Sequence, residues 1–249
     1  MVRTLIAGNW KMNGLMAALA EVDAIVDQVS GLSDDADLLI CPPATLIAPM
    51  VARAGDRLMV GGQSCHDMEK GAHTGDLSAE MLADAGAKYV IVGHSERRDD
   101  HAERSAFVKA QAEAALRAGL VPIVCVGEDY NQRARGETGE VIERIMRKSL
   151  PTLSGDAPSL VVAYEPKWAI GTGEVPTPEQ IGEVHSLIRR VLSETYGAPG
   201  ALMPILYGGS LKPGNAAEIL AVDEVNGGLI GGASLKANDL MAIYCTAIA

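Results

Sequence analysis

Short apolar runs alternate with amphipathic segments along almost the whole chain, and this alternation restricts the possible folds more than any other feature. Each run has only three or four residues and is rich in valine, isoleucine and leucine, which is typical of a buried strand. The runs occupy residues 5–8, 38–41, 58–60, 89–92, 123–126, 160–162, 205–207 and 228–230. Segments with helical character follow them, near residues 16–29, 44–54, 78–85, 104–118, 138–150, 178–196, 214–221 and 235–247. The sequence therefore predicts eight strand–helix units.

Eight such units predict an α/β protein with a closed parallel sheet. Because a helix separates each pair of consecutive strands, we expect the strands to pair in parallel through right-handed crossovers. Eight units that close on themselves form a (β/α)₈ barrel, in which parallel strands lie inside a ring of outer helices. No linker rich in proline, glycine or serine interrupts the series, so residues 1–249 are expected to form a single domain.

An open, doubly wound sheet shows the same alternation and is the alternative architecture. Such a sheet usually carries a glycine-rich fingerprint directly after its first strand. Here that position reads Gly-Asn-Trp-Lys-Met-Asn-Gly over residues 8–14, which is not this fingerprint. Polar residues instead follow several predicted strands, at the end where barrel enzymes place their sites, and this favours the barrel.

Three of the predicted strands are followed by side chains that suit catalysis. Asn9 and Lys11 follow the first strand, His94 follows the fourth, and Glu165 follows the sixth. An isolated lysine is usually a solvated surface residue, and an isolated histidine is more often structural than functional. Because the carboxyl ends of all barrel strands meet at one rim, these side chains are expected to converge there, and this favours an active site.

The segment after Glu165 has the composition of a lid. Proline at 166 ends the strand, and the Gly-Thr-Gly sequence at 171–173 is too flexible to continue regular structure. The predicted lid comprises Pro166, Lys167, Trp168, Ala169, Ile170, Gly171, Thr172 and Gly173. A carboxylate at a strand end beside such a lid is a candidate catalytic base.

Glycine-rich turns follow the seventh and eighth predicted strands. They read Tyr-Gly-Gly-Ser at 207–210 and Gly-Gly-Ala-Ser at 231–234, and they leave backbone N–H groups free to bind an anion. A glycine pair alone often marks only a tight turn. In barrels, however, these two loops are the usual phosphate site, and the second turn opens into a predicted helix whose positive end suits a phosphate.

Composition argues against several other classes of protein. The formal net charge of −11 disfavours a nucleic-acid partner. The four cysteines, at 41, 65, 125 and 245, match no zinc-binding spacing, and the N-terminal residues lack the apolar core of a signal peptide, which together predict a cytoplasmic location. No run approaches the roughly 20 apolar residues of a membrane span, so no membrane association is expected.

Seven ordered motifs make the chain closely similar to the triosephosphate isomerases over essentially its whole length. They are AGNWKMN at 7–13, VGHSERR at 92–98, CVGE at 125–128, AYEP at 163–166, WAIGTG at 168–173, YGGS at 207–210 and GGASLK at 231–236. The resemblance implies a TIM barrel with one catalytic domain. It also implies an aldose–ketose isomerase that interconverts dihydroxyacetone phosphate and D-glyceraldehyde 3-phosphate in glycolysis and gluconeogenesis, without a metal or an organic cofactor.

The resemblance assigns a role to each matching residue. Glu165 moves a proton between two carbons, and neutral His94 donates a hydrogen bond to the substrate oxygens. Lys11 and Asn9 stabilise the enediolate. The family is the standard example of this arrangement. The implied phosphate contacts are Asn9, Lys11, Gly171, Ser210, Gly231 and Gly232. The implied supporting residues are Ser95, Glu96, Arg97, Tyr207 and Leu229.

The family is typically homodimeric through the loop after the third strand. Here that loop spans residues 63–76, and Thr74 matches the position that reaches the neighbouring subunit's site. Two other functions stay open. One is an isomerase of a four-carbon sugar phosphate, because the same side chains tolerate an extra hydroxymethyl group. The other is a non-catalytic binding barrel, which should have lost some of the residues that are all present here.

Overall fold

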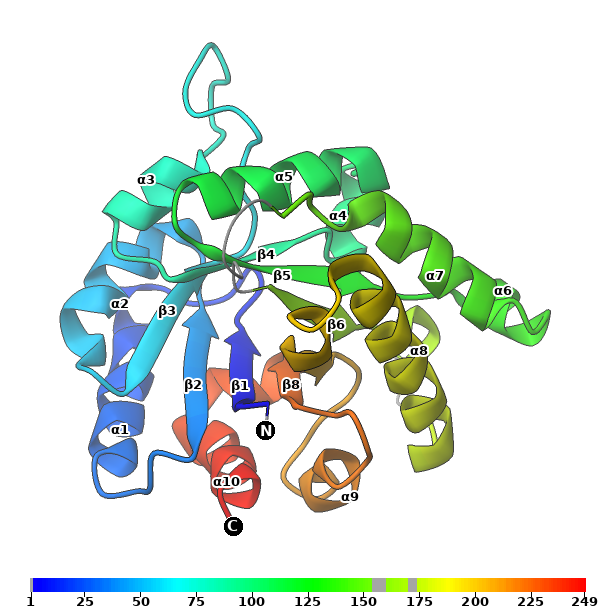
Figure 1. Cartoon of the computed structure of the whole chain (residues 1–249). Helices are drawn as coiled ribbons and strands as arrows, with labels where there is room; N and C mark the ends of the chain where they lie inside the picture. Colours follow the sequence, from blue (N-terminus) through cyan, green and yellow to red (C-terminus); the bar gives the residue numbers. More distant parts are fainter. Residues whose placement is uncertain (1, 154–159, 170–173) are drawn as a thin grey trace.

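The computed structural model describes residues 2–153, 160–169 and 174–249. Within them, eight parallel strands close into a barrel in sequence order, and β1 pairs with both β2 and β8. The strands are β1 (Thr4–Asn9), β2 (Ala36–Cys41), β3 (Leu58–Gly62), β4 (Tyr89–Val92), β5 (Val121–Val126), β6 (Val161–Tyr164), β7 (Ile205–Tyr207) and β8 (Gly227–Ile230). Helices surround them (Figure 1), so the predicted (β/α)₈ barrel is confirmed.

The helix that follows each strand lies close to its predicted position. These helices are α1 (Leu19–Val29), α2 (Ile47–Ala54), α3 (Ala79–Asp84), α5 (Ser105–Arg117), α7 (Thr138–Ser149), α8 (Pro178–Tyr196), α9 (Ala216–Leu220) and α10 (Ala237–Ala247). The sequence pattern missed two short helices, α4 (Ser95–Asp100) and α6 (Tyr130–Ala134). Both are mostly polar and at most six residues long, so neither carries an apolar stripe that periodicity detects.

Short 3₁₀ helices complete the described elements. They are η1 (Met16–Ala18), η2 (Ala44–Leu46), η3 (Lys167–Ala169), η4 (Gly200–Leu202) and η5 (Gly232–Leu235). The predicted helix at 16–29 therefore begins as η1, and the one predicted at 44–54 begins as η2. The predicted helix at 235–247 begins at Ala237, and η5 precedes it, so the turn after β8 opens into a 3₁₀ helix rather than an α-helix.

Two layers of apolar side chains hold the barrel together. Alternate residues of a strand face opposite sides of the sheet, so Leu5 and Ala7 fill the barrel interior whereas Ile6 packs with the outer helices. The interior layer consists of Leu5, Ala7, Leu39, Cys41, Ile91, Ile123, Cys125, Val161, Ala163, Leu206 and Leu229. Because side chains fill the interior, a ligand site is confined to an end of the barrel.

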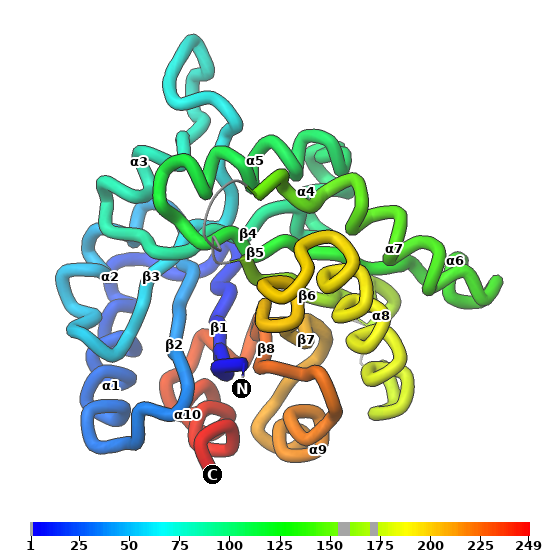
Figure 2. Tube along the Cα trace, viewed as in Figure 1, coloured from blue at the N-terminus to red at the C-terminus, as the bar shows by residue number. Residues whose placement is uncertain are grey.

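One loop projects well beyond the ring of helices. It joins β3 to α3 over residues 63–78 and stands clear of the barrel in the cartoon and in the tube drawing (Figures 1 and 2). At its base, the backbone N–H of His66 donates to the carbonyl oxygen of Leu77 at 2.7 Å, and His66 forms a bridge with Ser78. We call this segment the β3–α3 loop. In the described part of the chain, no helix is long and apolar enough to cross a membrane.

Candidate active site

A cavity of about 830 Å³ lies at the carboxyl ends of the strands. The loops after β1, β4, β6, β7 and β8 all contribute to its lining. Among the lining residues are Asn9, Lys11, His94, Ser95, Glu96, Glu165, Lys167, Ser210, Leu229, Gly231 and Gly232. The convergence that the strand order predicted is therefore observed, and it includes both glycine-rich turns.

Glu165 is the buried carboxylate of this cavity, with only 2% of its surface exposed. It follows β6, and its backbone N–H donates to the carbonyl oxygen of Val126 at 2.8 Å, which extends the sheet by one residue. Two glycines make room for it. A Cβ atom at Gly127 would collide with the backbone carbonyl of Glu165, and one at Gly208 would lie 2.9 Å from its Cγ. The glycines that directly follow β5 and β7 thus leave room for Glu165 between them.

Both oxygens of the Glu165 carboxylate accept hydrogen bonds from the loop after β4. Oε1 lies 2.7 Å from Nε2 of His94, and Oε2 accepts the backbone N–H of Ser95 at 2.9 Å. Burial raises the pKa of Glu165, but His94, the Ser95 N–H and Lys11 lower it, and the net direction is downward. The carboxylate is therefore ionised in the ligand-free site, as a catalytic base must be.

His94 is oriented by the short helix that the sequence pattern missed. It caps the N-terminus of α4, where its Nδ1 accepts the backbone N–H of Glu96 at 3.2 Å. A ring nitrogen that accepts a hydrogen bond carries no proton, so the proton of the neutral ring lies on Nε2, facing Glu165. Burial lowers the pKa of His94 and the Glu165 carboxylate raises it, with a net upward direction. The bond to Nδ1 opposes protonation and supports the neutral donor that the resemblance implies.

Lys11 is held in a left-handed backbone conformation, with φ of 52°. Its N–H donates to Oδ1 of Asn9 at 3.0 Å, and its carbonyl accepts Nε2 of Gln63 at 2.9 Å. The ammonium pairs with Oε1 of Glu96 at 2.6 Å. We assigned no role to Gln63 from the sequence. It directly follows β3, and a polar residue directly after a barrel strand is the feature that could have identified it.

The remaining supporting residues occupy different surroundings. The Arg97 guanidinium pairs with the buried carboxylate of Glu103 at 2.6 Å, behind the cavity rather than in it. Leu229 belongs to the apolar layer inside the barrel and also lines the cavity floor. The Tyr207 hydroxyl is buried without a hydrogen-bond partner in the described residues, and burial raises its pKa above the ordinary value.

The turn after β8 is fixed by its own Ser234 and by Trp10 from the opposite end of the sequence. Ser234 Oγ donates to the carbonyl oxygen of Gly231 at 2.7 Å, and the indole N–H of Trp10 donates to the carbonyl oxygen of Ser234 at 3.0 Å. Among the described residues, no atom lies within 4 Å of the position that a Cβ of Gly232 would take. The glycine turn is thus rigid on one side and open to the cavity on the other.

The first part of the predicted lid forms η3. The Trp168 indole donates to Oε1 of Glu128 at 2.9 Å, and the Lys167 ammonium pairs with Oδ1 of Asp99 at 2.7 Å. Glu128 is fully buried and also accepts the hydroxyl of Tyr164 at 3.1 Å, so it joins β5, β6 and the start of the lid. The rest of the lid, Ile170 to Gly173, lies outside the described residues, and so does the implied phosphate contact Gly171.

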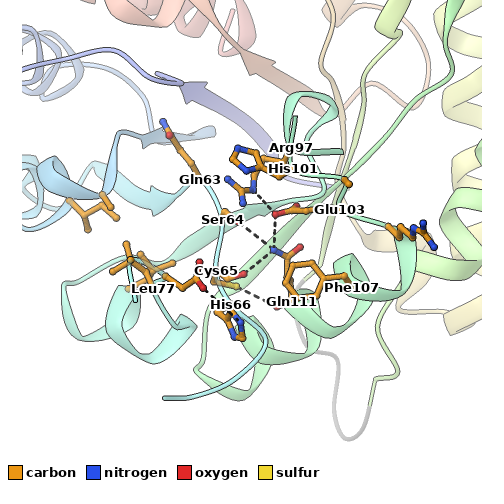
Figure 3. A pocket seen from close by; sticks show the side chains of 17 residues that line it. Gln63, Ser64, Cys65, His66, Leu77, Arg97, His101, Glu103, Phe107 and Gln111 are labelled. Atoms are coloured by element: carbon orange, nitrogen blue, oxygen red, sulfur yellow. Dashed lines mark hydrogen bonds and ion pairs between the residues drawn. The ribbon is translucent and has the colours of Figure 1, made fainter. Parts of the chain in front are cut away.

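A second pocket, of about 600 Å³, lies between the base of the β3–α3 loop and the helices α4 and α5 (Figure 3). At its back, Gln111 Nε2 donates to the carbonyl oxygen of Cys65 at 2.8 Å and approaches Oε1 of Glu103 at 3.4 Å.

Thr74 is exposed near the tip of the loop and does not line the active-site cavity of its own chain.

Comparison with known proteins identifies the family. The triosephosphate isomerase family model matches residues 4–247. The triosephosphate isomerase of Hyphomonas neptunium is 62% identical over 245 residues, covering 98% of each chain. That of Afipia carboxidovorans is 59% identical over 243 residues, covering 97% of this chain and 96% of the relative. The crystal structure of triosephosphate isomerase from Bartonella henselae superposes with a TM-score of 0.91 at 43% identity, covering 98% of this chain and 99% of that one. The chain therefore belongs to the triosephosphate isomerase family.

Proposed function

We propose that Glu165, His94, Lys11 and Asn9 catalyse the family reaction in this chain, the interconversion of dihydroxyacetone phosphate and D-glyceraldehyde 3-phosphate. Glu165 removes a proton from one carbon of the bound triose phosphate. The electron pair moves onto the adjacent carbonyl to form an enediolate, the hydroxyl proton passes from its oxygen to the former carbonyl oxygen, and Glu165 returns its proton to the neighbouring carbon as the new carbonyl forms. His94 donates to the substrate oxygens, and the Lys11 ammonium and Asn9 amide stabilise the developing negative charge.

The contact between Glu165 and His94 is the observation that carries this proposal. A buried carboxylate and a buried imidazole donor face each other at 2.7 Å in a cavity that also contains a lysine ammonium. A substrate that enters between them takes over the His94 donor with its oxygen atom and leaves one Glu165 oxygen free to accept a carbon-bound proton. The same step draws Lys11 away from Glu96 and toward the substrate.

We assign the substrate phosphate to Ser210, Gly231 and Gly232, together with Asn9, Lys11 and Gly171. The two described turns line the same cavity as Glu165, and Gly232 leaves open space in front of its backbone. Main-chain N–H groups at such turns bind phosphate without requiring a large positive surface, which agrees with the net charge of −11.

The direct test is the isomerisation rate of D-glyceraldehyde 3-phosphate by the purified chain. Glu165→Gln keeps the shape of the side chain and removes the base, so kcat is expected to fall roughly 100- to 10,000-fold. The same variant, purified in the same way, controls for contaminating isomerase. Equal turnover of the two proteins would refute the role of Glu165.

A four-carbon sugar phosphate, assayed beside the triose, tests the substrate assignment. Faster turnover of the tetrose would keep the mechanism and replace the substrate. No turnover of either compound would favour the binding barrel.

We also propose that residues 1–249 form one catalytic domain that works as a homodimer in the cytoplasm. Exposed apolar side chains support the dimer, because Met12, Leu15 and Met16 follow β1 and Met68 lies on the β3–α3 loop. The free cysteines support a reducing compartment.

Thr74→Arg places a charge on the loop that crosses the proposed interface, and sedimentation is expected to detect monomer. An unchanged dimer would refute the role of Thr74.

A further inference from the structure

An ion pair in the active-site cavity joins the segment after β6 to the helix α4. The Lys167 ammonium lies 2.7 Å from Oδ1 of Asp99, and both side chains line the cavity. Neither lines the second pocket, beside the β3–α3 loop that we assign to the subunit interface. We propose that Lys167 and Asp99 are positioning residues, whose pairing keeps Glu165 aligned with His94 while substrate lies between them. This inference rests on the proposed function.

Both ends of the ion pair are close in sequence to a catalytic residue. Lys167 begins η3, two residues after Glu165. Asp99 belongs to α4, the helix whose N-terminus His94 caps. Asp99 also lies one helical turn after Ser95, so it shares a face of α4 with the residue whose N–H bonds Glu165. The ion pair therefore runs alongside the contacts that Glu165 makes with His94 and Ser95.

Hydrogen bonds to the barrel hold α4 in place. Arg98 Nε donates to the carbonyl oxygen of Gly93 at 2.8 Å, and its Nη2 donates to the carbonyl oxygen of Cys125 at 3.2 Å. Gly93 directly follows β4, and Cys125 belongs to β5, so these bonds join α4 to two neighbouring strands. Asp99 is the next residue after Arg98, and it therefore offers the lysine ammonium a partner on a fixed element.

The ion pair matters because substrate breaks the contact between the two catalytic side chains. In the ligand-free site, His94 Nε2 lies 2.7 Å from Glu165 Oε1. In the proposed mechanism a substrate oxygen accepts the His94 proton donor, so this contact is lost when both groups must act. The pair of Lys167 and Asp99 does not involve Glu165 and stays intact. It limits a displacement of the base, and a displacement of about 1 Å can cost about 100-fold in rate.

A direct contact between Lys167 and the substrate phosphate would give different kinetics. Removal of the ammonium would then raise KM. Asp99→Asn, which releases the ammonium from its partner, would lower KM. A positioning role instead requires both members of the pair, so the loss of either one should lower kcat to a similar extent and leave KM nearly unchanged.

The test is a double-mutant cycle in the isomerisation assay of the full chain. Lys167→Met and Asp99→Asn should each lower kcat about two- to fivefold, the range that a solvated ion pair accounts for. The double variant should be no slower than either single variant, because both changes remove the same interaction. Lys167→Arg keeps the charge and should keep the wild-type kcat. The control cycle changes Arg53 and Asp23, which also pair at 2.7 Å but do not line the cavity.

Hydrogen exchange of the ligand-free protein provides a readout that needs no turnover. The N–H of Lys167 donates to the carbonyl oxygen of Glu128 at 3.1 Å, and that of Ala169 donates to the carbonyl oxygen of Pro166 at 2.8 Å. NMR should show faster exchange of both amides in Asp99→Asn and wild-type rates in Lys167→Arg. A wild-type chain without isomerase activity would refute the proposed function, whereas exchange rates that do not respond to Asp99→Asn would refute the positioning role.

The kinetic results can also overturn the proposal. It is wrong if kcat is unchanged in the single variants, if the two losses multiply in the double variant, or if Lys167→Met raises KM while Asp99→Asn lowers it. The last result would make Lys167 a direct ligand of the phosphate. All the side chains changed in both cycles are at least partly exposed, so every variant is expected to fold, which circular dichroism checks.

Discussion

At the level of single residues, Lys11 reaches the active site through a backbone conformation that few side chains adopt. The left-handed region costs a residue other than glycine roughly 1–2 kcal/mol. Asn9 and Gln63 compensate for this by bonding the N–H and the carbonyl of Lys11, at 3.0 and 2.9 Å. These two residues therefore hold the backbone of Lys11 in place, and this positions its ammonium in the cavity.

Lys11→Met tests what the charge itself contributes. The substitution keeps the aliphatic stem and removes the ammonium, so kcat/KM is expected to fall roughly 100- to 1,000-fold, the usual effect of losing one stabilising donor. Stability should change by less than about 1 kcal/mol, because the ion pair with Glu96 is partly solvated. Lys88→Met, at an exposed position directly before β4, is the control. A loss of less than tenfold in Lys11→Met would contradict the assigned role.

The ionisation of Glu165 depends on its contacts with the loop after β4. Because the hydrogen bonds from His94 and Ser95 and the charge of Lys11 outweigh burial, its pKa is expected below the ordinary value of 4.5 in the free protein. His94→Leu removes the donor and leaves burial less compensated, so the pKa should rise. Carboxyl ¹³C NMR titration, with Glu165→Gln to assign the signal, measures both values. An unchanged or lower pKa in His94→Leu would show that His94 does not stabilise the carboxylate.

At the level of elements, the strands and the long helices were predictable because each buries one recognisable pattern of apolar residues. The candidate site was predictable where a residue ends a strand or follows it within two positions, as Asn9, His94 and Glu165 do. The short helix α4 was not, although it orients His94, because its residues are almost all polar. The pairing of Arg97 with Glu103 and the bonds from Gln63 to Lys11 depend on side-chain packing, which linear spacing does not encode.

The segment between β6 and α8 yields a prediction about Tyr207. Its hydroxyl is buried without a partner in the described ranges, and the nearby helix α8 is preceded by Pro176, which has no backbone N–H to donate. The family resemblance implies that, in relatives that have one, a backbone N–H at position 176 bonds this tyrosine when the lid closes. Tyr207→Phe is therefore expected to cost less turnover here than in relatives that have that N–H, and less than about 1 kcal/mol of stability.

Matched assays of Tyr207→Phe in this chain and in such a relative are the measurement. Urea unfolding of the same two variants separates effects on stability from effects on turnover. An equal loss of kcat in both proteins would mean that the missing N–H at Pro176 has no influence on the tyrosine.

At the level of the whole molecule, the site exists only when the barrel is closed. Trp10 and Ser234 are 224 positions apart in the sequence, yet the indole of one holds the turn formed by the other. Pairing of β1 with β8 brings the Lys11 segment beside the glycine turn at 231–232. Global stability and activity are therefore expected to be lost together, which makes the pH dependence of unfolding relevant to function.

His185 on α8 gives that pH dependence a specific source. It is fully buried, its Nδ1 lies 3.0 Å from the carbonyl oxygen of Glu224, and its Nε2 has no partner in the described residues. Burial lowers its pKa to about 4 from the ordinary 6.5. Between these two values the unfolded chain binds more protons than the folded chain, so stability falls as pH falls. From the two pKa values, the full loss in the free energy of unfolding that His185 causes is about 3 kcal/mol.

Glutamine at position 185 cannot titrate. We therefore compare how much free energy of unfolding each protein loses between pH 7.5 and pH 4.5, and expect the loss in His185→Gln to be about 2 to 3 kcal/mol smaller than in the wild type. Urea unfolding at both pH values, at one fixed protein concentration, measures this difference. A constant packing cost of the substitution cancels, because each protein is compared with itself. If both proteins lose stability equally, burial does not lower the pKa of His185 in the folded chain, and carboxylates account for the acid sensitivity.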